Sequence, residues 1–201
     1  MTLRGVLKHE TEGLHTRLDA ALSALDLADP SDYGLFLRVH AAALPPVERE
    51  LERAGIGALM DDWPRRVRRP ALDGDLAALG LVPPAPIAFA PLLGADEMLG
   101  ALYVLEGSRL GHAVLLRHLP EDAPTRRATG FLAHGSGERL WGAFLAALAG
   151  REGTGADEAR MVGAARRTFA AYLAAVGDVL PTVPASLSAT PPPAPRMDLV
   201  S

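Results

Sequence analysis

The sequence predicts an all-α fold in a single domain, and three observations lead to this prediction. Apolar residues recur at helical spacing along most of the chain, as in the first segment, where Leu7, Leu14 and Leu18 fall on one helix face. No two segments form a convincing strand pair, and the chain shows no internal repeat and no phosphate-binding loop. The length of 201 residues suits one domain with a substantial core.

Capping residues, glycines and prolines set the expected boundaries. Pro45 and Pro46 are expected to end one helix and restart another, because proline lacks the backbone N–H. We expect a rigid, irregular linker over Leu81–Pro91, one domain over residues 1–180, and a flexible proline-rich tail over Pro181–Ser201. The helices are expected at Thr2–Leu27, Tyr33–Ala43, Val47–Ala54, Pro70–Gly80, Gly94–Leu119, Phe131–Ala133, Glu138–Ala149 and Ala156–Leu180.

The composition narrows the classes of function. The absence of cysteine excludes disulfides, zinc–thiolate and iron–sulfur sites, and cysteine nucleophiles. The formal net charge of −4 argues against nucleic acid as the main partner, because no overall basic field exists to neutralise phosphates. No uncharged apolar run of membrane-spanning length and no leader pattern is visible, so we expect a cytoplasmic protein without a membrane anchor.

One predicted helix contains glycines that weaken it. Gly100, Gly107 and Gly111 lie inside Gly94–Leu119, and each costs a helix about 1 kcal/mol relative to alanine. Close packing of two helices around small residues is one explanation. The other is that glycines four residues apart leave a helix face bare, so that a flat molecule can lie directly against the backbone.

A histidine on the first helix has an unusual setting. His15 lies about 100° to one side of the apolar stripe, with Thr11 and Lys8 on its own side and Asp19 one turn further on. A lone histidine on a helix is commonly a surface or hydrogen-bonded residue. In its neutral form it is also a common metal ligand.

These two motifs resemble those of bacterial haem oxygenases. The stretch from Glu106 to Gly111, with Tyr103 one turn upstream, is similar to the family's distal helix, which kinks at its glycines over the haem face. Leu7–Thr11 followed by His15–Asp19 is similar to its first helix, which carries the axial histidine. The resemblance extends more diffusely over about Leu3 to Ala175. It implies a helical fold that holds haem between the proximal first helix and the kinked glycine-rich distal helix.

The resemblance also implies roles for individual residues. His15 would be the iron ligand, and Gly107 and Gly111 would crowd the distal haem face and direct the chemistry to the porphyrin edge. Ser108 would anchor the water that supplies protons, although a hydrogen bond to its own helix is an equal alternative. The expected haem contacts are Lys8, Thr11, Tyr103, Gly107, Gly111 and Arg117, with Lys8, Tyr103 and Arg117 near the propionates.

The implied activity is oxidative cleavage of haem b to biliverdin, carbon monoxide and iron, using dioxygen and electrons from a ferredoxin or reductase. The pairing of Lys8 with Tyr103 favours biliverdin IXα, and the subtype resembles the haem oxygenases that supply biliverdin to bacterial phytochromes. Release of iron is the other purpose left open.

Two features leave alternatives open. His112 stands where the family usually has glycine or alanine. The second hypothesis is therefore a non-catalytic haem-binding or haem-sensing protein with His15 and His112 as ligands. The position of His112, one residue after Gly111, favours a place beside the bare helix face instead of on it. A thiaminase-like enzyme ranks lower, because its usual cysteine is missing. A cluster of arginines is interpreted as a solvated basic patch, or else a docking site for an acidic redox partner; it comprises Arg65, Arg66, Arg68 and Arg69.

Overall fold

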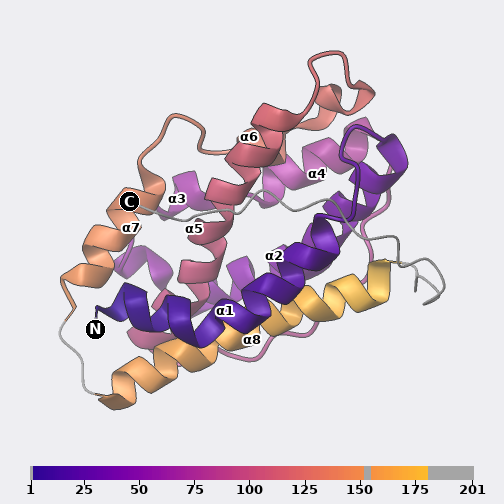
Figure 1. Ribbon diagram of the computed structural model, residues 1–201. Helices are drawn as coiled ribbons and strands as arrows, with labels where there is room; N and C mark the ends of the chain where they lie inside the picture. The colour runs from indigo at the N-terminus through magenta and orange to yellow at the C-terminus, as the bar shows by residue number, and fades with distance from the viewer. Residues whose placement is uncertain (1, 152–154, 181–201) are drawn as a thin grey trace.

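The computed structural model describes residues 2–151 and 155–180, and it is helical throughout the regular parts of these ranges (Figure 1). No β-strand occurs within them, which confirms the all-α prediction. The expected tail at Pro181–Ser201 lies outside the described residues, and the single domain over residues 1–180 stays a prediction. The α-helices are α1 Leu3–Leu22, α2 Pro30–Ala54, α3 Trp63–Arg66, α4 Arg69–Ala78, α5 Ala95–His118, α6 Gly130–Ala133, α7 Leu140–Ala149 and α8 Gly155–Val179, with 3-10 turns η1 Ile56–Ala58 and η2 Pro124–Ala128.

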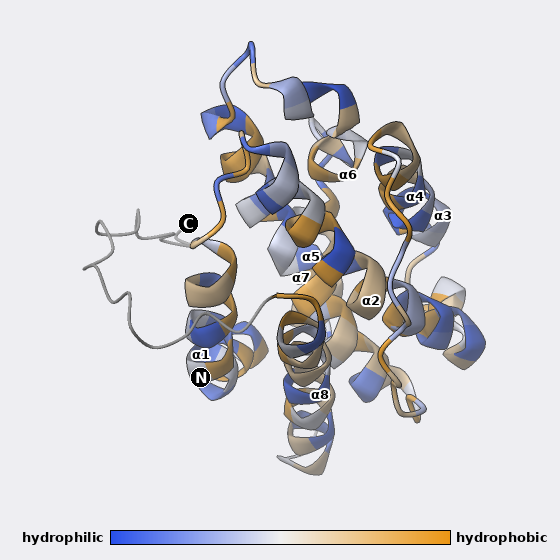
Figure 2. Cartoon of the chain, turned by 90° about the vertical axis from the view of Figure 1, so that its right-hand side faces the viewer, coloured by the Kyte–Doolittle hydropathy of each residue, from blue (hydrophilic) through white to orange (hydrophobic). Residues whose placement is uncertain are grey.

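The last helix, α8, is the element on which the others assemble. The helices α1, α2 and α5 all pack against α8, and Figure 1 shows α1 lying along α8 while α5 crosses it steeply. The side chain of Thr2 caps α1 by accepting a hydrogen bond from the Gly5 amide. Hydrophilic and hydrophobic residues alternate along α1 and α8, as expected for helices that bury one side (Figure 2).

The second helix shows where the sequence-based boundaries were wrong. Pro45 and Pro46 lie inside one continuous helix, α2, instead of separating two helices. In a regular helix the amide of residue 46 would bond the carbonyl of Ala42, and proline cannot supply it. The amide of Ile87 in the linker bonds that carbonyl instead, at 2.9 Å. Residues on both sides of the prolines, such as Leu44 and Val47, are fully buried, so packing stabilises the unbroken helix.

Most of the remaining helices lie close to their expected positions, but α1 ends at Leu22 instead of Leu27, and the short α3 was not expected. The short α4 packs against α2 and α6, and α5 continues through all three of its glycines. Residues 81–93 have no regular secondary structure, which agrees with the expected linker. Among the described helices, none has the length and apolar character needed to cross a membrane.

Candidate functional site

His15 on α1 has the geometry of an oriented and accessible imidazole. Its side chain is 34% exposed, and its Nδ1 lies 3.4 Å from Asp19 Oδ2 one turn along the helix. The ring packs edge-on against Phe169 of α8, with 5.7 Å between ring centres. Burial raises the pKa of the Asp19 carboxyl, and the nearby His15 acts against that rise. Because Nδ1 faces the carboxylate, Nε2 points the other way and has no polar partner in the described part of the chain.

The glycines of α5 serve two different purposes. A Cβ atom built on Gly100 would lie 2.0 Å from the carbonyl oxygen of Met161, so Gly100 lets α5 and α8 approach closely. This is the packing explanation that the sequence left open. A Cβ on Gly107 would meet only the edge of Trp141, at 3.9 Å from Cζ3, which is ordinary contact. Close packing with another helix therefore explains Gly100. At Gly107, by contrast, no neighbouring backbone would clash with a side chain.

The residues expected near the propionates are not all brought together. Tyr103 lies on α5, where burial raises the pKa of its phenol and the cation of Arg4 on α1 opposes that rise. Arg4 and Lys8 are one turn apart on α1, and Lys8 is exposed. Arg117 is exposed near the far end of α5, about 21 Å along the axis from Tyr103 at 1.5 Å per residue. Tyr103 and Arg117 therefore cannot share one propionate.

Thr11 is buried in the structure, and its hydroxyl is already used. Its Oγ1 donates a hydrogen bond to the carbonyl of Leu7, four residues earlier, at 2.7 Å. Its hydroxyl proton is therefore not available to a ligand, and a polar contact to Thr11 would have to use the oxygen as an acceptor.

The Ser108 hydroxyl is held from two sides. Its Oγ donates to the carbonyl of Leu105 at 2.8 Å and accepts from Nη1 of Arg68 at 3.0 Å. The bond to its own helix is the alternative named from the sequence, and the bond from Arg68 was not foreseen. One lone pair of the oxygen remains, so Ser108 can still accept a hydrogen bond from a water molecule.

Two of the four clustered arginines are not on a solvated patch, and that interpretation is wrong for them. Arg66 and Arg68 are each 1% exposed. Arg66 donates to both oxygens of Asp62 and, through Nη1, to Glu106 Oε2 at 2.7 Å. Buried charges are costly unless they are paired and hydrogen-bonded, and Asp62 and Glu106 pair with Arg66. The Arg68 guanidinium instead donates to the Ser108 hydroxyl and to the carbonyl of Leu105. Arg65 is exposed, as the sequence analysis expected, whereas Arg69 is half-buried and paired with Glu48 and Glu52.

The same buried ion pairs tie α5 to the start of α7. Glu106 binds Arg109 as well as Arg66, and Arg109 reaches on to the carbonyl of His134 at 3.3 Å. Arg66 Nη1 also donates to the carbonyl of Leu140, the first residue of α7, at 3.1 Å. The segment of α5 beside Gly107 is therefore fixed relative to α7.

His112 lies in the core, on the side of α5 that faces α2 and α6. It is 5% exposed, and its ring is 5.1 Å from that of His40 and 4.8 Å from that of Phe131. Burial, followed by the nearby His40 and Arg68, lowers its pKa well below the usual value. Helical geometry turns it about 140° away from Gly107, five residues earlier. This placement agrees with the flanking role expected from the sequence and speaks against His112 as an axial ligand.

The donor set fits haem. Haem needs one good nitrogen ligand, a flat surface free of side chains, and cationic or hydroxyl partners for its carboxylates. His15 supplies an accessible imidazole with a carboxylate behind its other nitrogen, the arrangement typical of metal-ligating histidines. Gly107 supplies a stretch of helix where a Cβ would meet no backbone, and Lys8 and Tyr103 supply polar groups on the two helices.

Sequence reasoning missed two residues of this region. Arg68 holds Ser108, and its burial could not be read from a run of arginines. Trp141 lies against Gly107, and no local pattern in the sequence indicates a contact between two residues so far apart in the chain.

Comparisons with known proteins agree with the resemblance. No protein-family model matches the chain. It is 35% identical to a haem oxygenase of Xanthomonas campestris over 97 residues, which is 48% of this chain and 58% of that relative. The fold is similar to that of the haem oxygenase of Neisseria meningitidis, solved with NO and CO bound, with a TM-score of 0.71, 24% identity, and coverage of 89% of this chain and 92% of that one. The helical fold expected from the motifs is thereby confirmed.

Proposed function

We propose that this chain is a haem oxygenase that binds haem between α1 and α5 and cleaves it to biliverdin, carbon monoxide and iron. Dioxygen and an external electron donor are the co-reactants. The likeness to the Xanthomonas and Neisseria haem oxygenases supports the proposal, as do the groups present on the two helices.

The observation that carries the proposal is the state of His15. Its Nδ1 is directed at Asp19, its Nε2 has no polar partner among the described residues, and the ring is one-third exposed on a helix that packs on α8 beside α5. An iron ligand gains both orientation and basicity.

The proposal also assigns roles to the other residues of the site. Haem, when bound, supplies the iron that activates dioxygen and the carbon that is oxidised. Gly107 and Gly111 leave room over the haem face, and Lys8 and Tyr103 bind the propionates. Ser108, held by Arg68, accepts a hydrogen bond from water through its remaining lone pair and so positions a proton source.

Several finer statements belong to the same proposal. Lys8 and Tyr103 together favour biliverdin IXα as the product. A ferredoxin or a reductase is the proposed electron donor, and a bacterial phytochrome is the proposed acceptor of biliverdin, with iron release as the other purpose. A cytoplasmic location stays a prediction from the sequence.

A single absorption experiment tests the activity. Purified protein is mixed with haem, and then reductant and air are added. We expect the Soret band to disappear and a broad red biliverdin band to grow. A stable low-spin spectrum would identify a haem-binding protein without turnover and would overturn the proposal.

The ligand assignment has its own test. His15→Ala should abolish turnover, and added imidazole should restore part of it, because imidazole can enter the space left by the side chain. His9→Ala is the matched control, since His9 is an exposed histidine on the same helix. Full activity in His15→Ala would show that another residue binds the iron.

A further inference from the structure

Trp141 is the side chain that lies beside the uncovered part of α5. Atoms Cζ3 and Cη2 at the far edge of its indole lie 3.9 and 4.0 Å from the position of a Cβ on Gly107. Its ring centre is 5.9 Å from that of Tyr103, one turn earlier on the same helix face. Trp141 therefore lies beside both the bare backbone and the phenol assigned to the propionates.

The position of Trp141 is fixed by its own helix and by the buried ion pairs. Its ring stacks on Phe144 of α7, with 5.5 Å between centres. The N-terminus of α7 is bound to Arg66 through the carbonyl of Leu140, and Arg66 is bound to Glu106, the neighbour of Gly107. Movement of the start of α7 relative to Gly107 would break these bonds.

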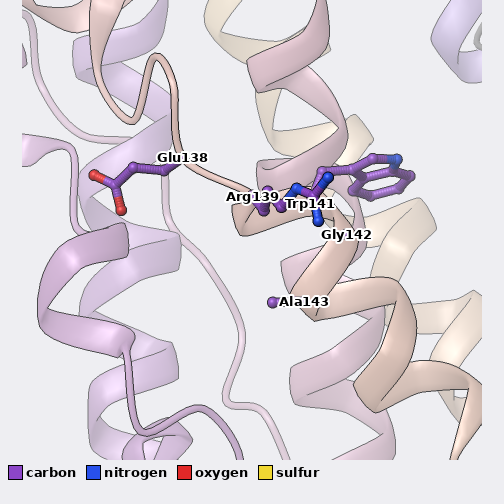
Figure 3. Close-up of a pocket in the computed structure, with 5 residues that line it drawn as sticks. All are labelled: Glu138, Arg139, Trp141, Gly142 and Ala143. Atoms are coloured by element: carbon purple, nitrogen blue, oxygen red, sulfur yellow. The ribbon is translucent and has the colours of Figure 1, made fainter.

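The chain before α7 is folded tightly against the same residues. Gly135 has a φ of 76°, and a Cβ there would come within 2.8 Å of Leu140 Cδ1 and 3.2 Å of Arg109 Nη1. Trp141 also lines a surface hollow of about 570 Å³ with Glu138, Arg139, Gly142 and Ala143, and Figure 3 shows its indole and the Glu138 carboxylate directed to opposite sides. The indole is thus half-buried and lies at the border between α5 and this surface hollow.

Resting on the proposed function, we infer that Trp141 selects which of the two face-flipped orientations haem takes between α1 and α5. Haem is nearly symmetric, and its two orientations differ only in where methyl and vinyl groups lie. A rigid aromatic wall beside the propionate partner Tyr103 distinguishes these groups by contact. Lys8 and Tyr103 set the direction of the propionates, and Trp141 sets which substituents lie against α7.

The test uses the ferric haem complex with cyanide, so it needs no turnover. Trp141→Phe keeps the stacking on Phe144 but removes the outer indole edge that reaches Gly107. We expect the ratio of the two haem orientations, read from haem methyl proton signals, to change about fivefold, the scale of one lost aromatic contact.

The matched control is Trp63→Phe. Trp63 is the other tryptophan, buried on α3 with its Nε1 donating to Glu52 at 3.3 Å, and its replacement should leave the orientation ratio unchanged. An orientation ratio in Trp141→Phe equal to that of the unaltered protein would overturn the inference.

A second measurement on the unaltered protein does not depend on the folding of any variant. Nuclear Overhauser contacts between the Trp141 indole protons and a haem methyl or vinyl group are expected, and their absence would also overturn the inference. Haem turnover without these contacts would remove the inference and leave the proposed function. If the contacts are found but haem is not degraded, the placement of Trp141 against haem stands and the proposed function is overturned.

Discussion

Alanine at Gly107 and at Gly100 should have opposite effects on stability, although both residues lie inside α5. Gly107→Ala gains about 1 kcal/mol of helix propensity. The new methyl meets only Trp141 at 3.9 Å, so no strain offsets this gain. The protein without haem should therefore unfold about 2–4 °C higher, given its size.

Gly100→Ala meets a fixed obstacle. The methyl would lie 2.0 Å from the carbonyl oxygen of Met161, about 1.3 Å closer than ordinary contact allows, so α5 and α8 must separate. Overpacking of this kind costs about 1–3 kcal/mol and more where backbone is involved. After the gain in propensity, we expect a net loss of about 2 kcal/mol.

The most informative comparison measures the stability and the haem turnover of the same variant, Gly107→Ala. Gly107→Ala should be more stable without haem and yet turn over haem about 10- to 100-fold more slowly, because a methyl displaces haem from the helix face. Urea unfolding of the haem-free protein gives the first quantity, and haem titration with single-turnover spectra gives the second.

The reasoning has two points of failure. If Gly107→Ala binds and degrades haem at the rate of the unaltered protein, the uncovered face does not hold haem. If Gly100→Ala is as stable as Gly107→Ala, the close approach of α5 to Met161 does not exist.

Three further perturbations test other parts of the site. Gly111→Leu should hinder haem entry and leave helical circular dichroism unchanged; unaltered haem affinity would count against a bare helix face. Ser108→Ala should lower the free energy of unfolding by about 1–3 kcal/mol, because Arg68 Nη1 loses its acceptor, whereas Thr168→Ala, which loses only a bond to its own helix, should cost less in urea unfolding. Burial lowers the pKa of His40 to about 4, so between pH 6.5 and 4 the unfolded chain binds a proton that the folded chain does not. The free energy of unfolding should therefore fall by up to about 3 kcal/mol as the pH is lowered over that interval. If His40→Gln shows the same dependence of stability on pH, this reasoning is refuted.

The sequence motifs predicted several local arrangements of the candidate site, because these depend only on residues one turn apart on a helix. The spacing of His15 and Asp19 fixes their meeting on any helix, and the structure shows Nδ1 facing the carboxylate. Glycines four residues apart predict a bare helix face in the same way. The positions of α1, α5, α7 and α8 followed from apolar periodicity together with capping residues, glycines and prolines, within a few residues at most ends.

The errors and omissions concern contacts between distant segments. Nothing local to Pro46 indicates that Ile87 will bond the carbonyl of Ala42 and keep α2 unbroken. A run of arginines is usually solvated. Arg66 is buried because the carboxylates of Asp62 and Glu106 offset the cost of removing its guanidinium from water. Each outcome depends on a partner that the chain brings close only after folding.

The sequence by itself determined the helices, the oriented imidazole of His15 and the glycines of α5, because these depend on neighbours within one or two turns. The tertiary structure decided which glycine serves packing, since Met161 lies against Gly100 and not against Gly107. It also decided that Arg68 holds Ser108 and that Trp141 lies beside the bare face, because these contacts join residues tens of positions apart.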